Sequence, residues 1–145
     1  MTTAQSAAPR RKRSARHTFA ATTLVLEGFV VLFATLAVFG LKAAPSGVVW
    51  PVGGALAVVL VLLPGLLSRP GGYLAGTVVQ GLVLAGGLVM FAAPVADATF
   101  LATMTLVVGV IFVALWTVAL RLGGRIDRER SEWDAAHPDG LGSRA

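Results

Sequence analysis

Apolar and polar positions follow one another in long blocks along this chain. Four apolar runs, residues 19–41, 48–67, 73–93 and 98–120, hold 20 to 23 residues each, and Glu27 is the only charged side chain inside them. At about 1.5 Å per residue, each run is long enough to cross a hydrocarbon core of about 30 Å as an α-helix. Because lipid offers the backbone no hydrogen-bond partners, the runs are predicted to be helices.

The connections between the runs are short and carry turn-forming residues. Residues 42–47, 68–72 and 94–97 are too few to lead the chain back across a bilayer, so successive helices must be antiparallel neighbours. Pro51 is expected in the first turn of the second helix, where a missing N–H costs little. Pro64 is expected to kink or fray the end of that helix. The predicted fold class is an all-α membrane protein, an antiparallel four-transmembrane-helix bundle.

The composition agrees with this pattern and limits the classes of function. Hydrophobic residues make up 56% of the 145-residue chain, and charged residues make up 13%. Ordinary soluble domains carry about 25% charged residues, so a conventional soluble enzyme is not favoured. The chain has no cysteine, which excludes a structural disulfide and a thiolate-bound metal.

The basic residues predict an orientation in the membrane. Eleven of the 12 Lys and Arg residues fall on one side of the predicted bundle, and only Lys42 falls on the other. The positive-inside rule therefore predicts a multi-pass protein of the plasma membrane with both termini in the cytoplasm. The cations are expected to set this topology and attract anionic lipid, not nucleic acid, because no extramembrane domain presents them. They include Arg10, Arg11, Lys12, Arg13, Arg16, Arg69, Arg121 and Arg125.

The chain divides into three parts. Residues 1–17 are expected to be a disordered basic tail, residues 18–122 the four-helix transmembrane domain, and residues 123–145 a charged cytoplasmic tail. Opposite charges four residues apart, as in Arg125 and Glu129, favour a short helix after Gly123-Gly124. The first apolar run exceeds the roughly 7–15 residues of a signal-peptide core, so it is expected to remain in the protein.

Glu27 and Gln80 are the candidate intramembrane polar site. A bare carboxylate at mid-span costs about 2.5–3.5 kcal/mol, so Glu27 requires protonation, a partner or a hydrated crevice. Small or polar residues, Ala20 and Thr23 among them, share its helix face, which favours a position inside the bundle. Gln80 lies at a similar depth in the third run, and a contact between Glu27 and Gln80 is predicted. Thr23 is included in this site.

A glycine stripe on the third run predicts close helix packing. Gly72, Gly76 and Gly87 fall on the same helix face as Gln80, and small residues four apart let two helix backbones approach closely. No combination of residues suggests a metal site, a catalytic triad or a phosphate-binding loop. No cofactor is expected.

Three short stretches resemble a known family. The stretches are Leu24–Val31 (LVLEGFVV), Gly65–Pro70 (GLLSRP) and Val110–Leu120 (VIFVALWTVAL). With them the sequence is similar to small four-span actinobacterial membrane proteins grouped as a domain of unknown function, and the similarity covers about residues 17–130. The resemblance matches Glu27, Arg69, Pro70, Gln80 and Trp116 to the family pattern. It also implies genes for folylpolyglutamate synthase and nucleoside diphosphate kinase nearby, but no activity.

Two functions from different classes remain open on the sequence alone. The first is a non-catalytic structural or accessory protein that packs against copies of itself or another membrane protein. The second is a small proton-coupled transporter in which Glu27 is the coupling carboxylate, as in the small multidrug-resistance exporters. The long basic N-terminal segment departs from that exporter pattern, and so does the third run, which has no aromatic residue between Tyr73 and Phe91. An enzyme is not expected, because Glu27 would be its only intramembrane acid or base.

Overall fold

The fold is a bundle of four long helices. The structure, a computed structural model, describes residues 14–42, 44–92 and 97–137. In these ranges four helical segments are long and apolar enough to cross a membrane: α1 (Ala15–Gly40), the composite segment Ser46–Leu66, α4 (Gly72–Met90) and α5 (Ala98–Ala136). No strand occurs in the described part of the chain. These findings confirm the predicted fold class of an all-α, four-span bundle.

The first helix begins earlier than the sequence pattern suggests. Residues 15–17, expected in the disordered tail, form the first turn of α1. Ser14 caps this turn, because its Oγ accepts a hydrogen bond from the backbone N–H of His17 at 3.4 Å. The expected lipid-binding residues Arg10, Arg11, Lys12 and Arg13 lie outside the described residues.

The second span is composite because of its two prolines. It consists of α2 (Ser46–Val49), the π-helical turn η1 (Trp50–Gly54), α3 (Ala55–Leu62) and the 3₁₀ turn η2 (Leu63–Leu66). The segment begins at Ser46, so Pro51 lies beyond the first turn, contrary to expectation. A proline at that place lacks an N–H and crowds the preceding turn, and the wider π turn accommodates it. Pro64 lies in η2, where the helix tightens before it ends, as predicted.

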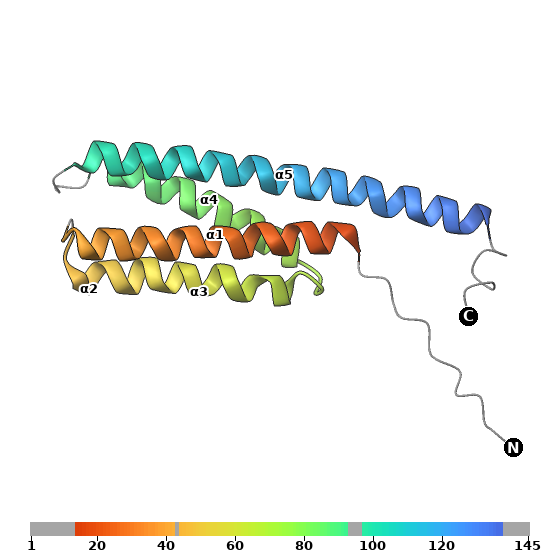
Figure 1. Cartoon of the computed structure of the whole chain (residues 1–145), viewed down its shortest axis with the longest axis horizontal. Coiled ribbons are helices and arrows are strands. Elements are labelled where there is room, and N and C mark those ends of the chain that lie inside the picture. Colours follow the sequence, from red (N-terminus) through yellow and green to blue (C-terminus); the bar gives the residue numbers. More distant parts are fainter. Residues whose placement is uncertain (1–13, 43, 93–96, 138–145) are drawn as a thin grey trace, which may run out of the picture.

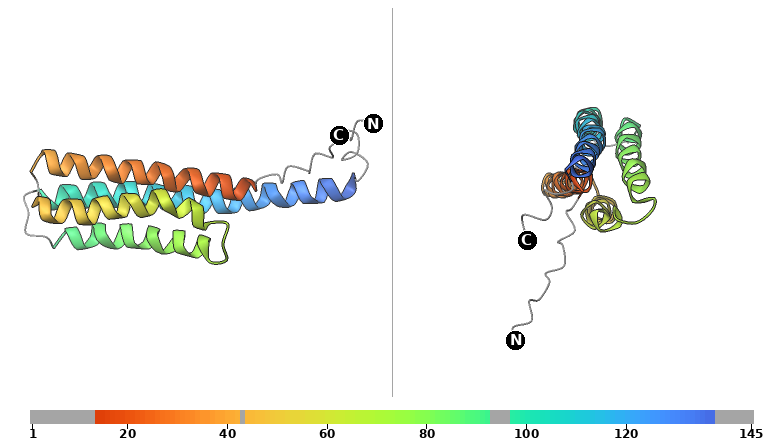
Figure 2. Two further views of the ribbon diagram at one scale, coloured as in Figure 1. Left: turned by 90° about the horizontal axis from the view of Figure 1, so that it is seen from below. Right: turned by 90° about the vertical axis from the view of Figure 1, so that its right-hand side faces the viewer.

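The helices are arranged around α1 and α5. α1 packs along α5 on one side and along η1 and α3 on the other, while α4 packs along α5 and touches η2 at its beginning. Figure 1 and the end view in Figure 2 show the four segments running up and down the bundle. Successive helices were expected to be neighbours, but the second span and α4 meet mainly at η2, because α4 packs along α5 instead. The α1 and α4 backbones touch little, so contacts between them depend on long side chains.

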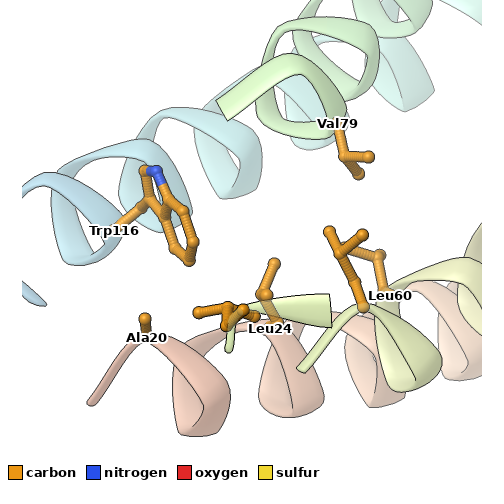
Figure 3. Packing of buried hydrophobic residues seen from close by; sticks show 7 residues of the cluster. Ala20, Leu24, Leu60, Val79 and Trp116 are labelled. Atoms are coloured by element: carbon orange, nitrogen blue, oxygen red, sulfur yellow. The ribbon is translucent and has the colours of Figure 1, made fainter. Parts of the chain in front are cut away.

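A compact apolar cluster occupies the centre of the bundle. Figure 3 shows Ala20 and Leu24 of α1, Leu60 of α3, Val79 of α4 and Trp116 of α5 pointing into a common space between the helices. Leu63 and Leu67 complete this cluster of buried residues. All four spans therefore contribute to one core.

The last helix continues far beyond the bundle. α5 is a single helix from Ala98 to Ala136, whereas the sequence pattern ended the span at residue 120 and placed a separate short helix after Gly123-Gly124. Its final turns project past the start of α1 in Figures 1 and 2. Helix α1 begins, and α5 leaves the bundle, at the same end.

Candidate functional site

Glu27 and Gln80 form a buried hydrogen-bonded pair between α1 and α4. Gln80 Nε2 donates to Glu27 Oε2 at 2.5 Å. The two side chains are only 1% and 2% exposed. Helical spacing explains the burial of Glu27, because Ala20, Leu24 and Glu27 lie on one face of α1 and are all buried. The structure therefore confirms the contact that was predicted from matching depths.

The pair leaves hydrogen-bonding capacity unused. Glu27 Oε1 and Gln80 Oε1 are both buried, and neither has a hydrogen-bond partner among the described residues. Buried polar atoms normally have a partner, so an unpaired carboxylate oxygen is an unusual feature. Glu27 Oε1 therefore retains the capacity to accept a hydrogen bond, and a donor reaches it only if the surrounding side chains move, because the atom has almost no accessible surface.

A cavity lies next to Glu27, between α1, α4 and α5. Its volume is about 260 Å³. Its α1 wall extends from Glu27 to Leu41, and its α5 wall from Leu101 to Phe112. Apart from Glu27 and Thr105, the lining side chains are apolar or glycine. The cavity is thus a mostly apolar space with one carboxyl group at its inner end.

Thr23, which the sequence placed in the polar site, takes no part in the pair. Its Oγ1 donates to the backbone oxygen of Phe19 in the preceding turn at 3.0 Å. This local bond satisfies the hydroxyl within α1, as is common for threonine in membrane helices. Thr23 is buried close to Glu27 in sequence but contributes no donor to the carboxyl group in the hydrogen bonds described.

The glycines of the predicted stripe, Gly72, Gly76 and Gly87, pack against two different segments. A Cβ at Gly76 would lie 2.5 Å from the Trp116 ring, and a Cβ at Gly87 would lie 2.9 Å from Leu106, both on α5. A Cβ at Gly72 would instead lie 2.1 Å from the backbone oxygen of Leu66, at the end of the preceding span. Gly76 and Gly87 therefore permit close packing of α4 on α5, whereas Gly72 permits the tight return between two spans.

Trp116 and Thr77 form a second polar contact between helices. Trp116 Nε1 donates to Thr77 Oγ1 at 3.2 Å, and this joins α5 to α4. The same indole ring packs over Gly76. The sequence indicated Trp116 through the family pattern but did not indicate Thr77. The sequence feature that could have indicated Thr77 is its position directly after Gly76, on a helix rich in small residues.

Asp127 joins the extension of α5 to the beginning of α1, and nothing in the sequence pattern predicted this contact. Its Oδ1 accepts a hydrogen bond from the backbone N–H of Ala15 at 2.7 Å, and its Oδ2 accepts one from Arg16 at 3.1 Å. The hydroxyl of Ser14 also donates to Asp127. Burial opposes ionisation, but these bonds and the charge of Arg130 lower the pKa of Asp127 below its ordinary value. A carboxylate from one helix therefore caps the N-terminus of another.

The described cations among those expected at lipid head groups, Arg16, Arg69, Arg121 and Arg125, lie at one end of the bundle and have varied surroundings. Arg16 is half-buried, and its guanidinium carbon lies 4.3 Å from the centre of the Tyr73 ring. Arg125 pairs with Glu129 at 2.7 Å, as the spacing predicted. Arg69, in the turn before α4, and Arg121 on α5 are exposed. Arg16 is thus a packing residue as well as a cation.

The described residues were also compared with the ligand sets that hold metal ions. No group of three or more His, Cys, Asp or Glu side chains that could hold a metal ion occurs in the part of the chain that the structure describes. The arrangement can hold helices together through hydrogen bonds, and it leaves the buried Oε1 of Glu27 without a partner beside the cavity.

Comparison with known proteins identifies a family but no characterised relative. Searches of curated proteins and of solved structures gave no match. The sequence profile of one family, described as "Protein of unknown function (DUF4233)", matches residues 17–132. The matched range includes the whole expected transmembrane domain, residues 18–122, and most of the α5 extension. It agrees with the resemblance to a family of unknown function that the short motifs indicated. The chain belongs to the DUF4233 family of proteins of unknown function.

Proposed function

We propose that this chain is a non-catalytic integral membrane protein with a structural or accessory role. The observation that carries the proposal is the use of its buried polar groups. Glu27 with Gln80, Trp116 with Thr77, and Asp127 with the start of α1 each join two helices. Such contacts hold a bundle in one shape and give specificity of packing.

The outer surface supports a role in contacts within the membrane. In the most apolar window of each span, between 17% and 28% of the residues are buried inside the chain. The remaining apolar side chains face lipid or a neighbouring membrane protein. Because the described chain has little structure outside the spans except the α5 extension, its contacts with other molecules would lie mostly in the bilayer. The proposed partners are a second copy of this chain or another membrane protein.

The test is a count of subunits in a lipid environment. The protein is extracted in a mild detergent, transferred to nanodiscs at a low ratio of protein to lipid, and weighed by native mass spectrometry. A homo-oligomer, or a complex of fixed stoichiometry with an identified membrane protein, is expected. Monomers alone, with no complex in the cross-linked native membrane, would argue against the proposed role.

A proton-coupled transporter is the alternative, and the cavity beside Glu27 is the observation in its favour. The cavity walls extend from Glu27 toward Leu41, which directly follows α1 at the end of the bundle opposite to Ala15. On the other side of Glu27, the apolar cluster around Leu24 and Trp116 closes the bundle. A transporter would need a second conformation that opens that side, so the accessory role is preferred.

The transporter alternative has its own experiment. Proteoliposomes with the wild-type chain or with Glu27→Gln are loaded with a pH-sensitive dye and exposed to lipophilic cations. A transporter requires proton release that depends on Glu27. Equal proton signals in the two preparations would leave the accessory role as the sole proposal.

The orientation and location belong to the same proposal. Arg16, Arg69, Arg121 and Arg125 lie at one end of the bundle, and Lys42 lies at the other. This distribution supports a multi-pass protein of the plasma membrane whose termini face the cytoplasm.

A further inference from the structure

We propose that the cavity beside Glu27 binds a small lipophilic amine, with the ammonium group at Glu27 and the apolar body toward Leu41. This inference goes beyond the accessory role and does not depend on it. It rests on the shape of the cavity, on the unpaired oxygen of Glu27 and on the lack of a cation within the spans.

The cavity has the size and lining of a small-ligand site. Its volume of about 260 Å³ exceeds the roughly 150 Å³ of an engineered cavity that holds benzene. It lies just below the roughly 300–1,000 Å³ typical of drug-sized ligands. Val31, Val83, Val108 and Phe112 are among its apolar lining residues. A compact apolar molecule fits this space better than a sugar, a nucleotide or a peptide.

The carboxyl group selects the polar end of the ligand. Glu27 is 1% exposed and lines the cavity, and its Oε2 is already occupied by Gln80. Its Oε1 has no partner among the described residues. A ligand with a hydrogen-bond donor at one end would supply the missing hydrogen bond to Glu27 Oε1. A purely apolar molecule, such as an acyl chain, cannot supply it.

Charge then favours an ammonium group over a hydroxyl group. The four apolar runs contain no Lys, Arg or His, so the spans supply no cation to compensate an ionised Glu27. A buried charge without a partner is strongly unfavourable, and an entering ammonium group would supply both the charge and the donor. Lipophilic amines also concentrate in membranes, so they reach such a cavity readily.

The experiment measures the binding of a cage amine and of its uncharged analogue. The probes are 1-aminoadamantane and 1-methyladamantane, which have the same apolar body and differ in the donor group. Equilibrium dialysis compares nanodiscs that contain the full chain with empty nanodiscs, so that partition into lipid is subtracted. We expect saturable binding of the amine at one site per chain, and binding of the methyl analogue that is at least about tenfold weaker.

Two variant pairs test the role of Glu27 and the location of the site. Glu27→Gln retains the size of the side chain and removes the charge, and it is expected to weaken amine binding about tenfold to a hundredfold. Val108→Phe is expected to fill the cavity and abolish binding while the Glu27–Gln80 pair remains. Val107→Phe is the matched control, because Val107 is 49% exposed and does not line the cavity. Circular dichroism and the elution volume confirm that each variant is folded.

The outcomes separate this inference from the proposed function. No saturable binding to the wild-type chain, equal affinity of the two probes, or unchanged binding in Glu27→Gln would each overturn the inference. Equal binding by Val108→Phe and Val107→Phe would place the amine elsewhere and would also overturn it. The subunit count that tests the accessory role is unaffected by any of these results.

Discussion

Two side chains, Glu27 and Gln80, connect helices whose backbones hardly touch. The carboxyl group of Glu27 accepts the hydrogen bond. The side chain of Gln80 is long enough to extend from α4 to α1, and its amide nitrogen donates the bond. The sequence predicted the pair from depth alone, since both residues lie about two turns inside their spans. It could not predict that Thr23 would bond to its own helix, because that choice depends on a local rotamer.

The Glu27–Gln80 bond predicts a non-additive pair of substitutions. Gln80→Leu removes the donor and leaves Glu27 buried without a partner, and is expected to reduce the free energy of unfolding by about 1–3 kcal/mol. The double variant Glu27→Leu/Gln80→Leu is expected to cost less than the sum of the single variants, with a coupling energy of about 0.6–2 kcal/mol. Unfolding in mixed detergent micelles measures both quantities. Strictly additive losses would contradict an energetic role of the bond.

Gly76 and Gly81 provide a matched test of close packing. A Cβ at Gly76 would lie 2.5 Å from the Trp116 ring, whereas nothing lies within 4 Å of a Cβ at Gly81. Gly76→Ala is therefore expected to destabilise the bundle by about 1–3 kcal/mol. Gly81→Ala is expected to be neutral or to stabilise by up to about 1 kcal/mol, because alanine favours the helix. Similar thermal shifts for the two variants would contradict the packing described.

Helix α5 is the element that differs most from its sequence pattern. Two glycines after Arg121 favoured a break, yet the helix continues to Ala136. The structure gives Gly123 another role, because a Cβ there would lie 2.4 Å from the Cα of Arg16. Gly123 permits α5 to approach the start of α1, and this approach brings Asp127 to the backbone N–H groups of Ala15 and Arg16. A pattern within one helix carries no information on such a contact between distant segments.

Asp127 is expected to stabilise the first turn of α1 most strongly in its ionised form. Asp127→Ala removes both accepting oxygens and should lower the local stability of that turn by about 1 kcal/mol, the value of a lost helix cap. Hydrogen exchange at the Ala15 and Arg16 amides measures this effect, and Glu132→Gln, an exposed residue of the same helix, is the control.

The pH dependence of this contact follows from the lowered pKa of Asp127. A folded pKa below the unfolded value means that the stabilisation is complete above the ordinary pKa of about 3.9. It is lost as the pH falls through the lower, folded value. An NMR titration of the Asp127 carboxyl group should therefore give a midpoint below the ordinary value for an aspartate side chain. A midpoint at or above the ordinary value would contradict the capping role.

The whole molecule has two chemically different ends. Arg16, Arg69 and Arg121 lie at the end where α1 begins, and Lys42 lies at the opposite end. The three-dimensional arrangement agrees with the loop assignment made from the sequence, because short loops and four spans leave no other course for the chain. The assignment of one end to the cytoplasm rests on the positive-inside rule alone.

Single cysteines in this cysteine-free chain test the orientation. Ser46→Cys and Ser68→Cys are nearly isosteric changes at exposed positions on opposite ends of the second span. In intact cells, a membrane-impermeant thiol reagent is expected to label Ser46→Cys and not Ser68→Cys, and in inverted vesicles the pattern should be reversed. Labelling of Ser68→Cys alone in intact cells would reverse the proposed topology.

The apolar runs were enough to predict the number of spans, their approximate lengths and their antiparallel order, because each helix in lipid must satisfy its own backbone hydrogen bonds. The sequence also predicted the Glu27–Gln80 contact, since depth is encoded by position along a span. The folded structure was needed to show that α1 packs along α5, that Gly76 and Gly72 face different segments, and that Asp127 caps α1. These features depend on the rotation of each helix about its axis. Side-chain packing sets that rotation, and a nearly uniform apolar sequence encodes it only weakly.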